Sequence, residues 1–319
     1  MKKVSIVVPM YNEEAMVELF LSTLMEVIKK EKDYEFEIVA VNDGSKDETL
    51  NLLYKAMKKY PMLRVVNLSR NFGHESAVAA GLSVASGDAV IPIDADLQDP
   101  PEVISGMLKL FAKGYDVVNA RRASRKEDTF IKRYTANKFY KVLDRISGKV
   151  KVPQNVGHFR LISRRVCDEV VKLTESSRVF RVQVPYVGYK TGEVVFARPK
   201  RPKGESHYNF ASMFDLAFNS IISTTIKPVY WPLKLAVFLA IMTGLSFVTE
   251  LVLFLINLFN NSLLVGVNHP LWLIINMILL VGTFLMFALG LIAIYVGKTF
   301  IESQKRPFFI IESIKENKK

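Results

Sequence analysis

Residues 91–101, which read IPIDADLQDPP, place acidic side chains directly after a short apolar run. Asp94 and Asp96 stand one residue apart, and Gln98 and Asp99 follow them before a proline pair. Mg²⁺ and Mn²⁺ prefer carboxylate and carbonyl oxygens, and they commonly share a few protein ligands with substrate phosphates. The pattern fits a divalent cation held beside a phosphate, and an acidic turn after a strand would use the same residue types.

Three more polar motifs follow apolar, β-branched runs. The runs are residues 4–8, 36–41 and 64–68, and the motifs after them read PMYNEE, NDGS and SRNFG. Further runs occupy residues 89–93 and 116–119, and longer stretches with helical spacing lie between the runs. This alternation predicts an α/β fold with a doubly wound, mostly parallel sheet. Because ligands bind outside the carboxyl ends of such strands, we expect all four motifs to line one crevice.

Apolar spacing also predicts local elements in other places. After the first strand, hydrophobic residues recur three or four positions apart, as in the buried stripe of a helix: Val17, Phe20, Leu21, Leu24, Val27 and Ile28. Farther on, residues 155–165 lead into a helix, and residues 180–188 read as a strand.

Composition narrows the class of protein. Half of the 319 residues are hydrophobic, yet the net charge is +12. A basic balance favours phosphate-rich partners such as nucleic acid, nucleotides or an anionic membrane surface. The single cysteine, Cys167, excludes an internal disulfide framework. The first apolar run is too short for a signal peptide and meets Asn12, Glu13 and Glu14, so we expect the N-terminus to stay in the cytoplasm.

Basic and aromatic residues alternate with aliphatic ones over residues 121–151. This pattern is typical of an amphipathic helix at a membrane surface, expected near residues 127–147, with a second one near 209–226. The alternative is a solvated helix packed on the domain. The strongly hydrophobic remainder of the chain argues against a nucleic-acid partner.

Two long apolar segments follow. Residues 235–259 are interrupted only by Glu250, and residues 271–297 contain no charge. Each is long enough to cross a hydrocarbon core of about 30 Å. Residues 257–270 between them carry no Lys or Arg, whereas lysines flank the pair, so both ends and the catalytic domain are expected in the cytoplasm.

The expected organisation therefore has three parts. Residues 1–226 form a cytoplasmic catalytic domain, and residues 227–300 form a two-helix membrane domain with spans at about 233–258 and 271–297. Residues 301–319 form a cytoplasmic tail. A subunit with only two spans is also expected to be capable of forming homo-oligomers.

The motifs PMYNEE, VNDGS, SRNFG, DADLQDPPE, VGHFRLISRR and RPKGESHY occur in the order, and at about the spacing, seen in family 2 glycosyltransferases. More narrowly, the chain resembles polyprenyl-phosphate glycosyltransferases of the GtrB and dolichyl-phosphate-mannose-synthase type over essentially its whole length. The resemblance implies a GT-A fold and a multi-pass protein of the inner (plasma) membrane. It also implies inverting transfer of a sugar from UDP-glucose or UDP-N-acetylglucosamine to undecaprenyl phosphate, for cell-envelope glycosylation.

The resemblance assigns roles to residues of each motif. The nucleotide-sugar would contact Pro9, Tyr11, Glu13, Asp43, Arg70, Asn71, Gly73 and Asp94. Mg²⁺ or Mn²⁺ would be held by Asp94, Asp96 and Gln98. The catalytic residues would be Asp96, Arg122 and His158. Candidates for capture of the acceptor phosphate are Arg121, Arg122, Arg125, Arg133, Arg201, Lys203 and His207.

The chemistry of such a transfer is mainly a positioning problem. A phosphate monoester has a second pKa of about 6, so the nucleophile is already largely anionic at neutral pH. It needs electrostatic capture and alignment more than deprotonation. His158 and His207 stand where relatives commonly have Asp and Lys. His158 either keeps the role of a base or orients the sugar or the acceptor, and the basic residues either contact the acceptor or bind anionic lipid.

Three other functions fit parts of the pattern. The first is a polyprenyl-phosphate mannosyltransferase that uses GDP-mannose. The second is a processive polysaccharide synthase, which would carry more spans and a QxxRW-type signature that this sequence lacks. The third is a non-catalytic membrane scaffold that binds sugar nucleotides, against which the intact Asp43, Asp94 and Asp96 argue.

Overall fold

The structure is a computed structural model, and the residues that it describes are 1–123, 153, 155–173, 179–197, isolated positions between 234 and 255, and 269–317. The chain divides into two compact units. The first unit comprises Met1–Ser220 with Arg306–Lys319, and the second comprises Ile221–Lys305. Each unit is described by itself.

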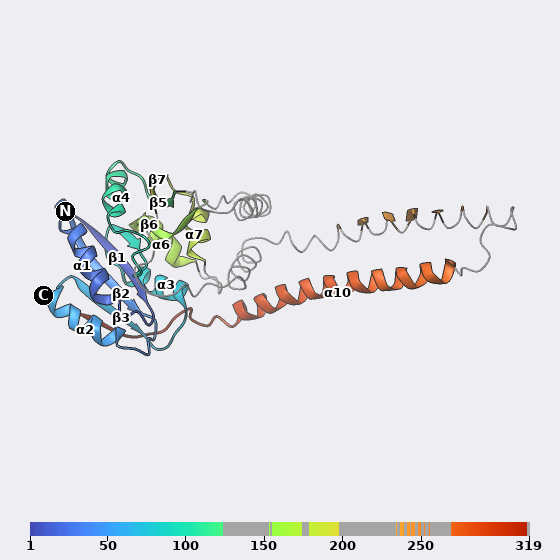
Figure 1. Ribbon diagram of the computed structural model, residues 1–319, viewed down its shortest axis with the longest axis horizontal. Coiled ribbons are helices and arrows are strands. Elements are labelled where there is room, and N and C mark those ends of the chain that lie inside the picture. The colour runs from blue at the N-terminus through green and yellow to red at the C-terminus, as the bar shows by residue number, and fades with distance from the viewer. Residues whose placement is uncertain are drawn as a thin grey trace. The chain divides into compact units, whose positions relative to one another are not determined.

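The described residues of the first unit form an eight-stranded sheet with the order β7-β5-β6-β4-β1-β2-β3-β8 (Figure 1). The strands are β1 (Lys2–Met10), β2 (Tyr34–Asn42), β3 (Leu63–Leu68), β4 (Ala89–Pro92), β5 (Val117–Arg122), β6 (Val156–Ser163), β7 (Thr191–Phe196) and β8 (Ile311–Glu316). The four strands β3, β2, β1 and β4 run parallel, as do β5 and β7. β6 runs antiparallel to β4 and β5, and β8 runs antiparallel to β3, so the sheet is mixed. The five predicted runs coincide with β1 to β5 to within a few residues.

Helices cover both faces of this sheet (Figure 1). One hydrophobic cluster includes buried residues of α1 (Val17–Ile28), α2 (Thr49–Lys59) and α4 (Val103–Ala112). The other includes buried residues of α3 (His74–Val84), α6 (Arg164–Lys172) and α7 (Phe180–Val187). Ile6 and Val8 belong to the first cluster and Val7 to the second, because successive side chains of a strand point to opposite faces. The doubly wound α/β arrangement is therefore confirmed.

The first helix is confirmed, and the strand predicted at residues 180–188 is wrong. All six residues of the predicted stripe are buried in α1: Val17, Phe20, Leu21, Leu24, Val27 and Ile28. Residues 180–187 form α7, which is followed by Gly188 with a φ of 78°. The buried positions of α7 are Phe180, Gln183 and Val184, which is the spacing of a helix face that packs on a neighbour. Tertiary packing thus overrides the β-branched composition of this segment.

The C-terminal tail contains a strand that we did not predict. β8 pairs with β3, with Ser313 opposite Asn67. Ser69 N donates a hydrogen bond to Ile310 O at 3.0 Å, and Phe309 and Ile311 pack against the second hydrophobic cluster. The residues that follow the apolar C-terminal segment therefore close one edge of the sheet.

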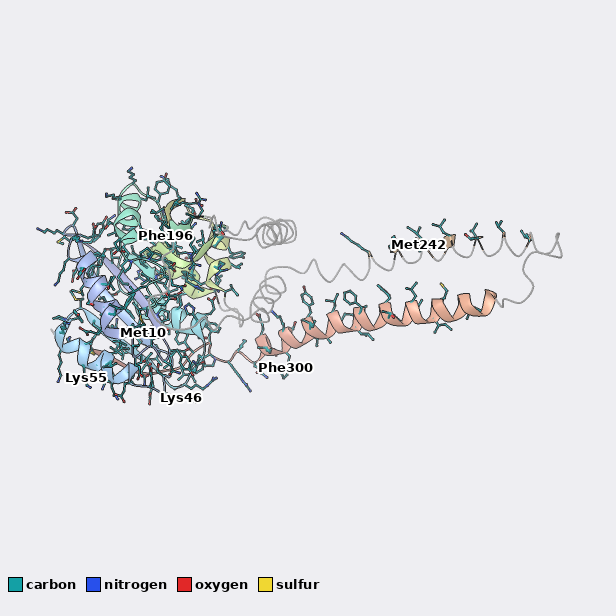
Figure 2. The ribbon with its side chains drawn as sticks, viewed as in Figure 1. Met10, Lys46, Lys55, Phe196, Met242 and Phe300 are labelled. Carbon is teal, nitrogen blue, oxygen red and sulfur yellow. The ribbon has the colours of Figure 1, made fainter. Side chains whose placement is uncertain are left out.

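The second unit contains α10 (His269–Ser303), which includes the predicted span at residues 271–297. Within it the 24-residue segment Leu280–Ser303 contains an 18-residue window with a mean hydropathy of 2.2, and none of that window is buried. At 1.5 Å per residue this length spans about 36 Å, enough for a bilayer core. Figure 2 shows its side chains, among them Phe300, which is 62% exposed. Among the described residues this is the one helix long and apolar enough to cross a membrane.

The interfacial helices near residues 127–147 and 209–226 lie outside the described residues, and so does most of the span at about 233–258.

A buried glutamate joins three segments at the amino end of the parallel strands. The Glu37 carboxylate accepts hydrogen bonds from Ser5 Oγ at 2.5 Å and from Ser86 N at 2.6 Å, and it forms an ion pair with Lys3 at 2.7 Å. Burial alone raises the pKa of Glu37, but the hydrogen bonds from Lys3, Ser5 and Ser86 outweigh burial and hold the pKa at about 2. Glu37 therefore remains ionised over the physiological range.

This pKa predicts a loss of stability in acid. Because the pKa of Glu37 is lower in the folded chain than its ordinary 4.5, the carboxylate stabilises the fold above pH 4.5 and ceases to do so as the pH falls toward 2. We expect Glu37→Gln to lower the Tm at pH 7 and to flatten the dependence of Tm on pH between these values, as measured by thermal unfolding. Glu35→Gln, at an exposed position of the same strand, is the control. An unchanged acid dependence in Glu37→Gln would contradict the assignment.

Candidate functional site

The loops that follow β1 and β2 are hydrogen-bonded to each other. Asn12 N donates to Ser45 Oγ at 3.0 Å, and Lys46 N donates to Asn12 Oδ1 at 2.9 Å. Asn12 has a φ of 52°, a left-handed conformation that asparagine tolerates better than most residues. The PMYNEE and NDGS motifs therefore lie together at the carboxyl end of the sheet, as predicted.

Asp43 connects the second motif to the third. Its side chain is almost fully buried, and its two carboxylate oxygens accept hydrogen bonds from Phe72 N at 2.8 Å and Gly73 N at 2.9 Å. Burial raises the pKa of Asp43, and the two backbone N–H groups offset part of that rise. In this structure Asp43 fixes the start of α3, and a contact with a nucleotide base would use its remaining lone pairs.

The approach of these two loops requires a glycine. Gly44 has a φ of 64°, and a Cβ at this position would lie 2.4 Å from the carbonyl carbon of Arg70 and 2.5 Å from Asn71 N. The Arg70 guanidinium lies over the Phe72 ring, 4.0 Å from its centroid. The loop that carries Arg70 and Asn71 thus packs directly on the backbone of the NDGS motif.

His74 joins the third motif to the fourth. Its Nε2 lies 2.8 Å from Asp94 Oδ1, and the two side chains are 42% and 37% exposed. Burial lowers the pKa of His74, but the hydrogen bond to Asp94 and the charges of Asp94, Glu75 and Asp43 together raise it. Burial raises the pKa of Asp94, but His74, with the charges of His158 and Arg122, holds it well below the usual range. Asp94 is therefore an anion at neutral pH.

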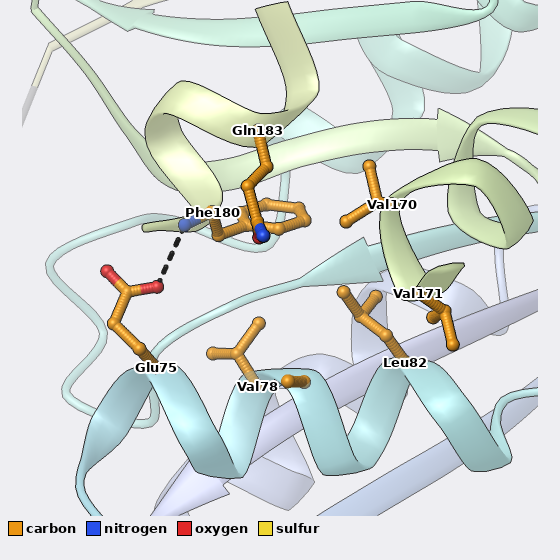
Figure 3. Close-up of a pocket in the computed structure, with 8 residues that line it drawn as sticks. Glu75, Val78, Leu82, Val170, Val171, Phe180 and Gln183 are labelled. Atoms are coloured by element: carbon orange, nitrogen blue, oxygen red, sulfur yellow. Dashed lines mark hydrogen bonds between the residues drawn. The ribbon is translucent and has the colours of Figure 1, made fainter. Parts of the chain in front are cut away.

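His158 is held in the same neighbourhood by Glu75. His158 Nε2 lies 2.8 Å from Glu75 Oε1. Phe180 N donates to Glu75 Oε2 at 3.0 Å (Figure 3). The His158 ring centroid is 4.6 Å from that of His74 and 6.1 Å from that of Phe180. Burial raises the pKa of Glu75, but the charge of His158 and its hydrogen bond outweigh burial and lower that pKa, so Glu75 is a carboxylate.

The contacts of Asp43, Asp94 and His158 described above all involve three consecutive residues at the start of α3. Residues 73–75 hold Asp43, Asp94 and His158, in that order. The structure therefore brings together one residue from each of the predicted nucleotide, metal and catalytic groups. His74 and Glu75 were not among the predicted site residues, although both directly follow the SRNFG motif.

The predicted metal ligands supply hard oxygen donors. Asp94 and Asp96 lie on one turn, in which Leu97 has a φ of 57° and Gln98 N donates to Asp96 Oδ1 at 3.0 Å. No group of three or more His, Cys, Asp or Glu side chains among the described residues is placed to hold a metal ion. Two carboxylates nevertheless fit Mg²⁺ or Mn²⁺ when substrate phosphates complete the coordination shell.

The two adjacent arginines predicted for the acceptor have different partners. Arg122 forms a bidentate pair with the buried carboxylate of Asp99, in which Arg122 Nη2 lies 3.1 Å from both oxygens. Arg121 instead pairs with Glu193 on β7 at 2.9 Å. The charge of Arg122 also helps to lower the pKa of Asp94. The structure therefore places Arg122 in the electrostatic field of the candidate site.

The remaining predicted residues are at the rim or outside the described part of the chain. Pro9 is buried in β1, Tyr11 is 42% exposed, and Glu13 accepts a backbone hydrogen bond from Met16 N at 2.8 Å. Five predicted acceptor-side residues lie outside the described residues: Arg125, Arg133, Arg201, Lys203 and His207.

This chain is similar to a protein family and to several known proteins. The model of the family described as Glycosyl transferase family 2 matches residues 5–171. The chain is 37% identical to an uncharacterized glycosyltransferase of Synechocystis, over 98% of this chain and 95% of that protein. It is also 37% identical to the bactoprenol glucosyl transferase of Shigella phage SfV, over 98% of this chain and 99% of that protein.

Solved structures also match part of this chain, at lower sequence identity. One is a glucosyl-3-phosphoglycerate synthase from Mycobacterium tuberculosis in complex with Mn²⁺, UDP and glucosyl-3-phosphoglycerate. The similarity covers 70% of this chain and 78% of that one, with 19% identity and a TM-score of 0.49.

The contact at Gly44 yields a prediction. We expect Gly44→Ala to destabilise the fold by more than the ~1–2 kcal/mol of a left-handed alanine, because the new methyl group would also meet the backbone of the 70–71 loop. Gly114→Ala is the matched control, since Gly114 has a φ of 80° and a Cβ at this position would have no atom within 4 Å. Equal shifts of Tm for the two variants in thermal unfolding would contradict this close approach.

Proposed function

The chain belongs to glycosyl transferase family 2, and from this membership we propose that it transfers a glucosyl group from UDP-glucose to a polyprenyl phosphate such as undecaprenyl phosphate. The full-length match to a bactoprenol glucosyl transferase supports both the sugar and the lipid acceptor. The observation that carries the proposal is the arrangement of Asp43, Asp94 and His158 around residues 73–75.

The proposed fold is of the GT-A type, with the donor at the carboxyl ends of the parallel strands. The loops after β1, β2 and β3 would enclose the nucleotide. Ligands of open α/β sheets bind at this position, outside the carboxyl ends of the strands. Asp43 would face the base, and Arg70 and Asn71 would lie on the same side. The contact of Gly44 with the 70–71 loop supports one continuous wall for this pocket.

Asp94 and Asp96, with Gln98, would hold Mg²⁺ or Mn²⁺ against the donor diphosphate. The bound cation would stabilise the negative charge that develops on the leaving nucleoside diphosphate. The low pKa of Asp94 supports this role, because the carboxylate is ionised before any cation arrives. The hydrogen bond from Gln98 N orients the Asp96 carboxylate within the turn.

The acceptor side would use cations and His158. A lipid phosphate is largely dianionic at neutral pH, so Arg122 would attract and align it rather than activate it. The bidentate pair with Asp99 holds the Arg122 guanidinium in one orientation. His158 would orient the acceptor or the sugar for attack on the face opposite the leaving group, which inverts the anomeric centre.

The proposed location is the plasma membrane, with the catalytic unit on the cytoplasmic side. α10 provides a helix of sufficient length and apolarity. Lys298, Lys305 and Arg306 follow its apolar part, and the positive-inside rule then places the C-terminus in the cytoplasm. An acceptor carried by the bilayer would reach the site from the same membrane.

A donor panel tests the function. Full-length protein in membranes is incubated with undecaprenyl phosphate and radiolabelled UDP-glucose, UDP-N-acetylglucosamine or GDP-mannose. We expect labelled glucosyl lipid from UDP-glucose, and its formation should stop with EDTA and resume with added Mg²⁺ or Mn²⁺. Transfer to protein or polysaccharide, with none to the lipid phosphate, would contradict the proposal.

The metal-binding role of Asp96 predicts a large loss of turnover. A metal that stabilises developing charge contributes several kcal/mol to the transition state, so Asp96→Asn should lower kcat by about 100-fold or more. Asp33→Asn, at an exposed position between α1 and β2, should leave kcat unchanged. Near wild-type turnover in Asp96→Asn would remove Asp96 from the proposed site.

A further inference from the structure

We propose that His74 and Glu75 are positioning residues of the transfer reaction. His74 would set the Asp94 carboxylate for the metal-bound donor, and Glu75 would set the His158 imidazole on the acceptor side. This inference rests on the proposed function and assigns roles to two residues that the predicted site did not include.

The contact between His74 and Asp94 is well placed for the first role. His74 Nε2 bonds one carboxylate oxygen of Asp94 at 2.8 Å, which restricts rotation of the carboxylate and leaves its other oxygen to a cation. Partners that hydrogen-bond a metal-ligating group typically change metal affinity by about 10–100-fold when they are removed. His74 is therefore expected to govern binding of the metal and donor rather than the stability of the fold.

The surroundings of Glu75 fit the second role. Phe180 N donates a hydrogen bond to Glu75 Oε2 (Figure 3). This bond fixes the carboxylate, whose Oε1 lies 2.8 Å from His158 Nε2. Glu75 also lines a pocket whose other walls are mainly apolar, including Val78 and Leu82, and a low-polarity environment strengthens such a bond. Since Nε2 of His158 is engaged by Glu75, a contact of this imidazole with the substrate would use Nδ1.

The charge of Glu75 also acts on a buried arginine. Arg160 is fully buried; burial and the charge of Arg181 lower its pKa to about 9, while the charge of Glu75 acts to raise it. The Arg160 guanidinium lies 5.4 Å from the centroid of the Phe180 ring. The charge of Glu75 therefore also acts favourably on a buried cation, in addition to the contact of Glu75 with His158.

His74 and Glu75 are consecutive residues of α3, so one helical turn can carry out both positioning roles. Successive residues of a helix point about 100° apart, so the first turn of α3 can direct His74 toward the loop after β4 and Glu75 toward β6. The preceding Gly73 is fixed by Asp43. Asp94 on the donor side and His158 on the acceptor side are thus both positioned by the first turn of α3.

The His74 role is tested by metal binding without turnover. Binding of Mn²⁺ to full-length protein in detergent, in the presence of UDP, is measured by electron paramagnetic resonance of the free ion. We expect His74→Ala to weaken Mn²⁺ binding by about 10–100-fold, and His74→Gln, whose amide can still donate to Asp94, to recover most of the loss. Wild-type affinity in His74→Ala would overturn this role.

The Glu75 role is tested by separating kcat from binding. Glu75→Gln, which is nearly isosteric, should lower kcat by at least about 10-fold and leave Mn²⁺–UDP affinity within about 2-fold of wild type. In a His158→Asn background the same substitution should have little further effect on kcat, because its partner is gone. A full additional loss in that background would overturn the coupling.

The control is Glu169→Gln, which removes an exposed carboxylate paired with Lys172 on α6 and should change neither measurement. Thermal unfolding of each variant identifies loss of the fold, and His74→Gln and Glu75→Gln are the variants of least change in volume. If wild-type protein binds Mn²⁺–UDP in a manner that needs His74 but transfers no sugar to lipid phosphate, the proposed function fails and the His74 role stands. If wild-type protein transfers sugar and His74→Ala binds Mn²⁺ normally, only the His74 role fails.

Discussion

The site depends on the buried carboxylate of Asp43, which accepts hydrogen bonds from two backbone N–H groups. Asp43, which directly follows β2, accepts hydrogen bonds from Phe72 N and Gly73 N in the loop between β3 and α3. These bonds fix the position at which α3 begins. The two bonds help to orient the first turn of α3 and the side chains that it presents to Asp94 and His158. A residue predicted to recognise a nucleotide is thus also the structural support of the site.

The carboxylates in this region are paired with cationic or imidazole side chains. The anions Asp94 and Glu75 are each paired with a histidine, and Asp99 is paired with Arg122. Burial would raise the pKa of Asp94 and Glu75, and the histidines reverse that tendency. Keeping carboxylates ionised in a partly desolvated site is what a hard divalent cation requires of its ligands.

The sequence was sufficient to predict the parallel core and the edge at which the motifs meet. Strands buried on both faces are continuous apolar runs, so β1 to β4 could be located from composition alone. β8 could not, because a short alternating edge strand is defined by its partner, and β3 is far away in the chain. α7 was misassigned since Val182, Val184 and Val187 favour a strand locally, whereas packing selects the helix. The sequence motifs do not identify His74 and Glu75 as site residues, because what marks them is their contacts with Asp94 and His158, which are distant in sequence.

The position of β8 has a consequence for biosynthesis. Asn67 of β3 bonds Glu312, and 245 positions separate the two residues in the chain. β8 also lies C-terminal to α10, so it leaves the ribosome after that helix. The sheet therefore gains this strand only after α10 has been synthesised, and a chain arrested before residue 311 would display β3 as an open edge able to pair with a neighbouring molecule.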